Sequence, residues 1–292
     1  MTSYLTQFTE TLRAEERSEN TVQSYLSDLK HFAEWFEGTN GQAFKPEAIM
    51  PIDIGQYKSY LQTVKGFKPA TVNRRLAAIK RLCRWARSQS LIEENPAAEI
   101  KGVPRQRTAP KALTRREAAH LVRMAQRHGD KRDVAILQLL RHTGVRVSEL
   151  CGLTRQDLEI SERKGQITVR YGKGGRYREI PLNRDARRAL REYLEVRPKA
   201  EDRHLFIGQR GNGLGRAAVY DVVTKYARLA GLEDVSPHTL RHTFGKLALD
   251  EGENLVTVAH LMGHSWLDTT AIYTQPSQRD LEDAVEKLAD PK

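Results

Sequence analysis

Apolar residues recur at helical spacing through the first hundred positions of the chain. In the stretch "SENTVQSYLSDLKHFAEWFE", which begins at Ser18, one helical face holds Val22, Tyr25, Leu26, Leu29, Phe32 and Phe36. The hydroxyl of Ser18 stands just before this pattern, where it can cap the helix. Two further segments of the same kind follow, near residues 51–64 and 70–90. The pattern therefore predicts an all-helical region over residues 1–97.

The second half of the chain again has mainly helical periodicity, with one interruption. The stretch "QITVRYGKGGRYREIPL" alternates apolar and polar residues up to Tyr171, turns at GKGG and resumes at Tyr177. Alternation on both sides of a glycine-rich turn predicts a β-hairpin, with Lys173 at its turn. GKGG lacks the G-x-x-x-x-G-K-[ST] spacing of a P-loop, so it does not predict binding of a nucleoside triphosphate. The predicted fold class is mainly α, with a small antiparallel β-sheet in the second half.

Between the two halves lies a basic stretch of low apolar content. The sequence "KGVPRQRTAPKALTRRE", residues 101–117, has six basic residues before its first acid and two prolines. This composition is typical of a linker that touches phosphate. We therefore expect a helical domain over residues 1–97, a basic linker over 98–112 and a second domain over 113–292.

The overall charge points to a polyanionic partner. With 48 lysines and arginines against 37 acids, the formal net charge is +11, which favours nucleic acid over a membrane surface. No apolar run approaches the roughly 18 residues of a membrane span, and the start "MTSYLTQFTETL" has no apolar signal core. We expect a cytoplasmic protein of bacterial or archaeal type that is associated with the nucleoid.

The strongest basic segment coincides with the last predicted helix of the first half. "KGFKPATVNRRLAAIKRLCRWARS", residues 65–88, has eight lysines and arginines and no acid, on an apolar inward face. Such a helix suits a DNA groove, and the alternative is a merely solvated basic helix. The candidate DNA-binding residues are Arg74, Arg75, Lys80, Arg81, Arg84 and Arg87, with Arg105 and Arg107 in the linker.

A second candidate site opens a helix in "SPHTLRHTFG", residues 236–245. Ser236 suits the N-cap and Pro237 the first helical position, which places His238 in the first turn and Arg241 on the same face. The free N–H groups of a first turn favour an anion such as phosphate. A zinc site is the alternative, since His238 and His242 are four apart. However, Thr239 stands where a zinc hydrolase needs its glutamate. A solvated basic helix start is a third possibility.

Four separated segments share this anion-binding chemistry. They are "HTGVRVSELCGL" with Arg146, the hairpin with Lys173, "HTLRH" with His238 and Arg241, and "AHLMGHSWLDTTAIYT" with His264 and Tyr273. From His238 to Tyr273 the last four residues run at intervals of 3, 23 and 9. In this order and spacing the segments resemble the tyrosine recombinase and phage integrase family, particularly its two-domain Xer-like members. The resemblance covers nearly the whole chain, and the N-terminal half is similar to that family's SAM-like core-binding domain.

The resemblance implies a role for each of these residues. Tyr273 would be the nucleophile that attacks a DNA phosphodiester and forms a 3′-phosphotyrosyl link. Arg146 and Arg241 would hold the non-bridging phosphate oxygens, with His264 as a further donor. Such chemistry keeps the bond energy, so the resemblance implies no ATP, metal or other cofactor.

Two proton transfers and one supporting contact complete the implied site. Lys173 would protonate the departing 5′-oxygen, and His238 would accept the tyrosine proton. Glu149 follows Arg146 by one helical turn and would brace Arg146 or His238.

The tail "SQRDLEDAVEKLADPK" has Leu281, Val285 and Leu288 on one helical face and an excess of acids. An acidic helix suits protein better than DNA. In the family such a helix docks on a neighbouring subunit and links four protomers on two DNA sites, and packing on its own domain is the alternative. Chromosome dimer resolution, transposon resolution, integration and a partner recombinase all remain open. So do two other classes, a non-catalytic DNA-binding protein and a metal-dependent nuclease.

Overall fold

The computed structural model describes residues 3–104, 110–170 and 177–263. The chain divides into two compact units, Met1–Arg107 and Thr108–Lys292. Each unit has its own hydrophobic core.

The first unit is helical, as the apolar spacing predicts. Its helices are α1 (Ser3–Ala14), α2 (Glu19–Asn40), a short 3₁₀ turn (Pro46–Ala48), α3 (Pro51–Thr63) and α4 (Pro69–Ser88). Ser18 is the N-cap of α2, and its hydroxyl accepts a hydrogen bond from the Thr21 amide. Pro51 and Pro69 occupy first-turn positions, where the missing N–H costs nothing.

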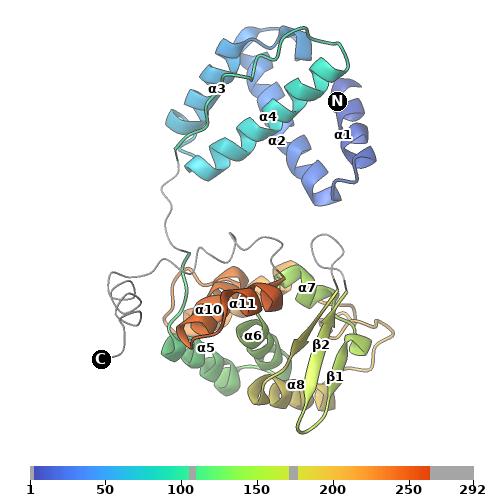
Figure 1. Cartoon of the computed structure of the whole chain (residues 1–292), viewed down its shortest axis with the longest axis vertical. Coiled ribbons are helices and arrows are strands. Elements are labelled where there is room, and N and C mark those ends of the chain that lie inside the picture. The colour runs from blue at the N-terminus through green and yellow to red at the C-terminus, as the bar shows by residue number, and fades with distance from the viewer. Residues whose placement is uncertain (1–2, 105–109, 171–176, 264–292) are drawn as a thin grey trace, which may run out of the picture. The chain divides into compact units, whose positions relative to one another are not determined.

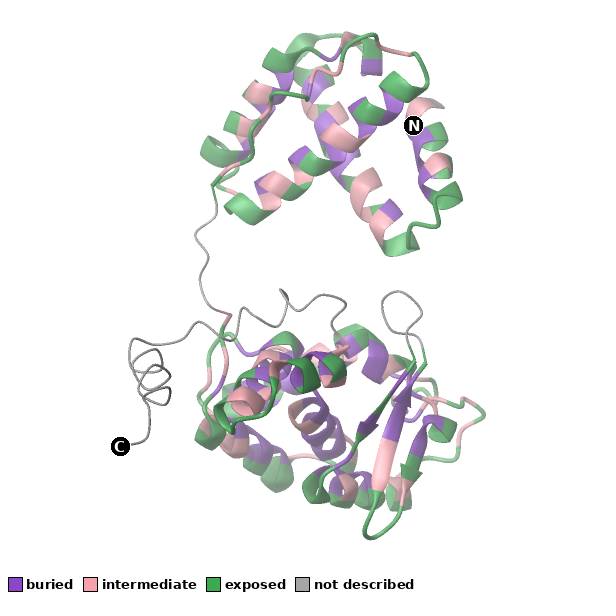
Figure 2. Ribbon diagram, in the orientation of Figure 1, coloured by how far each residue is buried: buried purple, intermediate pink, exposed green. Residues whose placement is uncertain are grey.

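Aromatic side chains fill the core of the first unit. Phe32 contacts four rings, with centroids 4.9 Å from Tyr57 and 5.8 Å from Phe44. Phe8 of α1 meets Trp85 of α4 edge to face at 5.6 Å. The contact between Phe8 and Trp85 joins the first and the last helix of the unit through residues 77 positions apart. The apolar face of α4 is therefore buried, and its polar face is left at the surface (Figure 2).

The second unit is built around α6 (Lys131–Thr143). Residues 133–140 of this helix are all buried, as the purple stretch of the helix in Figure 2 shows. It packs against α5 (Arg115–His128), α8 (Arg184–Val196), α9 (Arg216–Leu229) and α10 (Pro237–Asp250). A helix that is apolar nearly all round can only be stable in such a central position.

The predicted hairpin is present as two strands of a three-stranded antiparallel sheet. The strands β2 (Gly165–Val169) and β3 (Arg178–Pro181) pair with Ile167 opposite Ile180 and Val169 opposite Arg178. A third strand, β1 (Leu158–Ile160), pairs on the other side of β2, and the alternation argument did not predict it. The hairpin turn, residues 171–176, lies outside the described residues. The mainly α fold class with a small antiparallel sheet is confirmed.

The described part of the second unit also has the 3₁₀ turn Arg155–Asp157 and two short α-helices. Helix α7 (Val147–Gly152) follows α6, and α11 (Leu255–Met262) follows α10. Helix α11 packs on α10 and on β3, and Figure 1 shows α10 and α11 side by side on the face toward the viewer. Gly263 ends α11 with a left-handed φ of 65°, a conformation that glycine adopts without strain.

The connection between the units is anchored at both of its described ends. The Asn73 side chain donates to the Val103 carbonyl at 2.8 Å and accepts from the Val103 amide at 2.7 Å. On the other side, the Leu113 amide donates to Oγ1 of Thr243 in α10 at 2.9 Å. The first residues of the predicted linker 98–112 therefore pack on the first unit, while the predicted domain limits stay predictions. No helix in the described ranges is long and apolar enough to cross a membrane.

Candidate active site and DNA-binding face

Helix α10 begins as the sequence predicts. Ser236 is its N-cap and accepts from the Thr239 amide, and Pro237 is the first helical residue. His238 is exposed in the first turn. Partial desolvation and the charges of Arg241 and Arg146 lower the pKa of His238 below 6.5. The imidazole is therefore neutral at pH 7 and able to accept a proton.

Arg241 lies one turn further along α10 and is 6% exposed. Its guanidinium donates to the carbonyl of Gly144, at the end of α6, and to the carbonyl of Met262 at 2.7 Å. A buried arginine thus joins α6, α10 and the end of α11. The planar fork of donors makes two directed bonds at once, which a lysine ammonium cannot reproduce.

Arg146 reaches the same end of α11 from the N-cap of α7. One of its terminal nitrogens donates to the Gly263 carbonyl at 2.9 Å and the other to Oε1 of Glu149 at 2.8 Å. Glu149 also accepts from the Arg146 amide at 2.8 Å. The structure therefore places Glu149 against Arg146, one of its two predicted partners.

Sequence reasoning missed a third arginine at this place. Arg178 of β3 is 5% exposed and donates to both carboxylate oxygens of Glu149, at 3.1 and 2.8 Å. Its Nε donates to the Leu261 carbonyl at 3.0 Å. The available signal was strand parity, because Ile180 and Leu182 are buried and Arg178 lies on the same face.

The three arginines thus bind three consecutive carbonyls at the end of α11, those of Leu261, Met262 and Gly263. This is the negative end of the helix dipole, which favours cations. Burial alone would raise the pKa of Glu149, but hydrogen bonds from Arg178 and Arg146 outweigh it and hold the pKa below 4.5. The carboxylate is therefore charged at neutral pH and shared by two guanidinium groups.

Three predicted catalytic residues, Lys173, His264 and Tyr273, lie outside the described residues. The described chain does place their neighbours: β2 and β3 flank the hairpin turn, and Gly263 directly precedes His264. Among the described residues, no three His, Cys, Asp or Glu side chains gather as a metal site requires.

The basic helix α4 divides into inward-held and outward-facing cations. Arg74 and Arg75 both form ion pairs with the buried Asp28. Arg75 is also stacked on the Phe67 ring, and its side chain is only 13% exposed. Arg81 pairs with Glu15. These three arginines hold α4 to its own domain, and contact of Arg75 with DNA would require these bonds to break.

The other three predicted cations of α4 are differently placed. Arg84 and Arg87 are exposed, and Lys80 is half-buried. In the described parts of the chain none of the three forms an ion pair with a carboxylate. The remaining two predicted DNA-binding residues, Arg105 and Arg107, lie outside the described residues.

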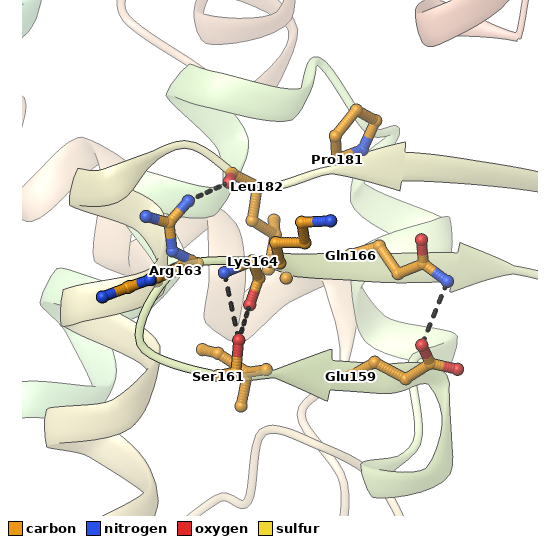
Figure 3. A pocket seen from close by; sticks show the side chains of 10 residues that line it. Glu159, Ser161, Arg163, Lys164, Gln166, Pro181 and Leu182 are labelled. Atoms are coloured by element: carbon orange, nitrogen blue, oxygen red, sulfur yellow. Dashed lines mark hydrogen bonds between the residues drawn. The ribbon is translucent and has the colours of Figure 1, made fainter.

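A pocket of about 570 Å³ lies at the end of the sheet where β1 and β2 are joined. Figure 3 shows it around the turn between β1 and β2. In this turn the Ser161 hydroxyl donates to the Lys164 carbonyl at 2.9 Å and accepts from the Lys164 amide at 3.0 Å. Arg163 and Arg187 also line the pocket. Arg146, Arg178 and Arg241 do not line this pocket, so it is separate from the three arginines at the end of α11.

Two family models match the chain, one for each unit. That of the phage integrase family matches residues 111–279, which is more than half of the chain. That of the phage integrase N-terminal SAM-like domain matches residues 5–90. The chain belongs to the phage integrase family.

Curated and solved members of the family extend the match to the full length. The tyrosine recombinase XerC of Thermodesulfovibrio yellowstonii is 36% identical over 97% of this chain and 95% of that protein. The crystal structure of XerA recombinase is 28% identical, covers 99% of both chains and has a TM-score of 0.56. The match to the crystal structure of XerH bound to its difH substrate, a pre-cleavage complex, covers 96% of this chain and 84% of the XerH chain, with a TM-score of 0.76. Its identity of 24% supports the fold alone.

These matches confirm the predicted family and the predicted enzyme class. The chain is a tyrosine site-specific recombinase of the Xer and integrase kind, an enzyme that binds DNA, cuts it and rejoins it. The SAM-like first domain and the catalytic second domain are those of the predicted fold class.

Proposed function

We propose that Tyr273 is the nucleophile of this recombinase and that the cut strand is held as a 3′-phosphotyrosyl link. The phenolic oxygen forms a bond to the scissile phosphorus, and the bond from phosphorus to the 5′-oxygen breaks. The reverse attack by a 5′-hydroxyl rejoins the strand and releases the tyrosine. The number of phosphodiester-type bonds is unchanged, so no ATP is consumed, and none of these steps needs a metal ion.

Arg146 and Arg241 are proposed to hold the non-bridging oxygens of that phosphate. The observation that supports this best is their convergence on the carbonyls of Met262 and Gly263, next to His264. Each guanidinium has five donor hydrogens, so it can bind a phosphate oxygen in addition to a carbonyl. Held rigidly by α6, α7 and α11, the two groups meet the growing charge of the transition state without reorganisation.

The proton transfers fall to two further groups. His238 is proposed to take the phenolic proton, for which its lowered pKa provides the neutral imidazole. Lys173 is proposed to give a proton to the leaving 5′-oxygen, and His264 to donate a hydrogen bond to the phosphate. Glu149 would keep Arg146 in place.

The first domain is proposed to clamp duplex DNA through the outward-facing cations of α4. Lys80, Arg84 and Arg87 are best placed for phosphate contacts. Arg74, Arg75 and Arg81 would act mainly by fixing the helix through their ion pairs. Arg105 and Arg107 would add contacts from the linker.

The active assembly is proposed to be a tetramer on two DNA sites in the bacterial or archaeal cytoplasm. The apolar face of the acidic tail, Leu281, Val285 and Leu288, would dock on a neighbouring protomer. A second recombinase as partner is compatible with this arrangement. Dimer resolution, transposon resolution and integration are all reactions that such a tetramer could perform.

The Tyr273→Phe variant tests the chemistry. A duplex site selected by the wild-type protein from a random library, nicked to trap the intermediate, should give a covalent adduct with wild type and none with the variant. Affinity for the site should be nearly unchanged, because only one oxygen atom is removed. An adduct formed by Tyr273→Phe would overturn the proposed nucleophile, and wild-type cleavage that stops in a chelator would restore the nuclease alternative.

A further inference from the structure

We propose that Arg178 is a positioning residue for strand cleavage: it binds the charge of Glu149 and so leaves the Arg146 guanidinium available to DNA phosphate. Arg178 touches neither substrate nor reacting atoms in this scheme and acts through Glu149 and Arg146. The inference rests on the proposed role of Arg146 in binding the scissile phosphate.

The geometry fixes Arg178 more tightly than a surface ion pair would. Its guanidinium forms two bonds to Glu149 and a third to the Leu261 carbonyl. Gly263 leaves room for it, since a Cβ at that position would lie 2.6 Å from Nη1 of Arg178. The side chain thus passes across the chain directly before His264, in the packed interior between β3, α7 and α11.

The charges explain why this position matters for Arg146. Glu149 is 6% exposed and holds one negative charge between two guanidinium groups. In a poorly hydrated interior such a charge attracts a nearby cation strongly. Without Arg178, the carboxylate would keep Arg146 as its one remaining arginine partner among the described residues. Arg146 would then be drawn onto Glu149 in a two-pronged ion pair, in competition with phosphate.

The test compares single-turnover cleavage by full-length variants on a nicked duplex that bears the site selected by wild type. Arg178→Met should cleave roughly 10- to 100-fold more slowly than wild type. This fall is smaller than the fall in rate that follows removal of one hydrogen-bond donor to the transition state, because Arg146 is weakened and not removed. The dissociation constant for the same duplex should change by less than about threefold. The double variant Arg178→Met with Glu149→Gln should regain most of the rate, because a neutral amide no longer competes for Arg146 and still accepts from its backbone.

Arg197 offers a matched control in the same domain. It binds the carbonyls of Leu205, His204 and Asp202, and no carboxylate among the residues that the structure describes. Arg197→Met should lower the melting temperature and leave the cleavage rate of folded, DNA-bound protein unchanged. A purely structural Arg178 would behave in the same way as Arg197, so an Arg178→Met variant that cleaves at the wild-type rate overturns the proposal. So does a double variant no faster than Arg178→Met.

Two further comparisons keep the outcomes separate. If Arg178→Met does not fold, the comparison is between Glu149→Gln and the double variant, which should cleave at equal rates. A double variant that cleaves more than about tenfold more slowly than Glu149→Gln would contradict the charge argument. Arg146→Gln tests the underlying assignment. If it cleaves normally, the proposed role of Arg146 fails. If Arg146→Gln is inactive while Arg178→Met is not impaired, only the inference about Arg178 fails.

Discussion

At the scale of single residues, a basic side chain can be found from the sequence, but its partner cannot. Arg75 and Arg84 belong to the same basic helix. Arg75 bonds to Asp28, 47 positions earlier in the chain, whereas Arg84 is exposed. The carboxylate that decides between them comes from another helix, so no local pattern reveals it. The same holds for Arg178, whose strand parity showed that it faces inward but not that Glu149 was its partner.

The environment of His238 predicts how cleavage depends on pH. Desolvation, Arg241 and Arg146 lower the pKa of His238 below 6.5, so the neutral base persists down to that pH. On the acid side, the single-turnover cleavage rate should therefore reach half of its plateau only below pH 6.5, and should fall by about tenfold per pH unit once the imidazole is protonated. Rates measured from neutral to acid pH on the selected nicked duplex provide the check.

Two variants test whether His238 is the group whose protonation lowers the cleavage rate at acid pH. In His238→Gln the rate should be lower throughout, and the fall attributed to His238 should disappear. His142 is the control, because burial lowers its pKa to about 4 and it lies at the end of α6, hydrogen-bonded to Asn183. His142→Asn should keep the wild-type pH profile. An unchanged acid limb in His238→Gln would show that another group titrates there.

At the scale of elements, helix ends and the hairpin were predictable because their determinants are local. Ser18 and Ser236 cap helices at the positions that the sequence pattern predicts. Strand β1 was not predictable in the same way, since three residues are too few for alternation to show and it is held by pairing with β2. The convergence of arginines from α7, α10 and β3 on three carbonyls at the end of α11 also lies beyond sequence reasoning, because it depends on how separate elements pack.

The division of α4 into two sets of cations predicts which ones bind DNA. Reversing Arg84 and Arg87 to glutamate should weaken duplex binding and reduce the slope of log K against log salt by roughly 0.9 for each phosphate that the variant no longer binds. The adduct yield of the fraction that remains bound should not change, since both residues lie in the first unit. Binding titrations between about 50 and 200 mM salt measure the slope.

Lys30 provides the comparison within the same domain. It is exposed on α2, so Lys30→Glu alters the charge of the unit without touching α4 and should leave the slope near its wild-type value. An equal loss of affinity from Lys30→Glu would mean that overall charge, not the face of α4, determines binding. A collapse of cleavage by the bound Arg84 and Arg87 double variant would contradict the division between clamp and catalytic domain.

At the scale of the whole molecule, composition located the connection between the units but not its anchors. The basic, proline-containing stretch was expected to be a linker over 98–112. However, Asn73 holds Val103 on the first unit, and Thr243 holds Leu113 on the second. Thr243 lies two residues beyond Arg241 in α10. The chain therefore enters the catalytic unit on the helix that holds a proposed phosphate ligand, a relation between distant segments that only the fold can show.

These anchors set how far the clamp can be from the catalytic domain, and Asn73→Ala should lengthen that reach. Val103 would lose both bonds to Asn73 while Lys58 still holds the Lys101 carbonyl, so residues 102–103 would add up to about 7 Å of extended chain. A longer tether lowers the effective concentration of one DNA-binding unit at the other's site, so duplex affinity should fall roughly 1.5- to 2-fold. Amide exchange at Val103 should become faster while exchange at Leu113 is unchanged. Asn95→Ala is the matched control, since its side chain accepts from the nearby Ala97 amide and, within the described ranges, holds no distant segment. Faster exchange at Val103 with unaltered affinity would show that tether length does not limit DNA binding.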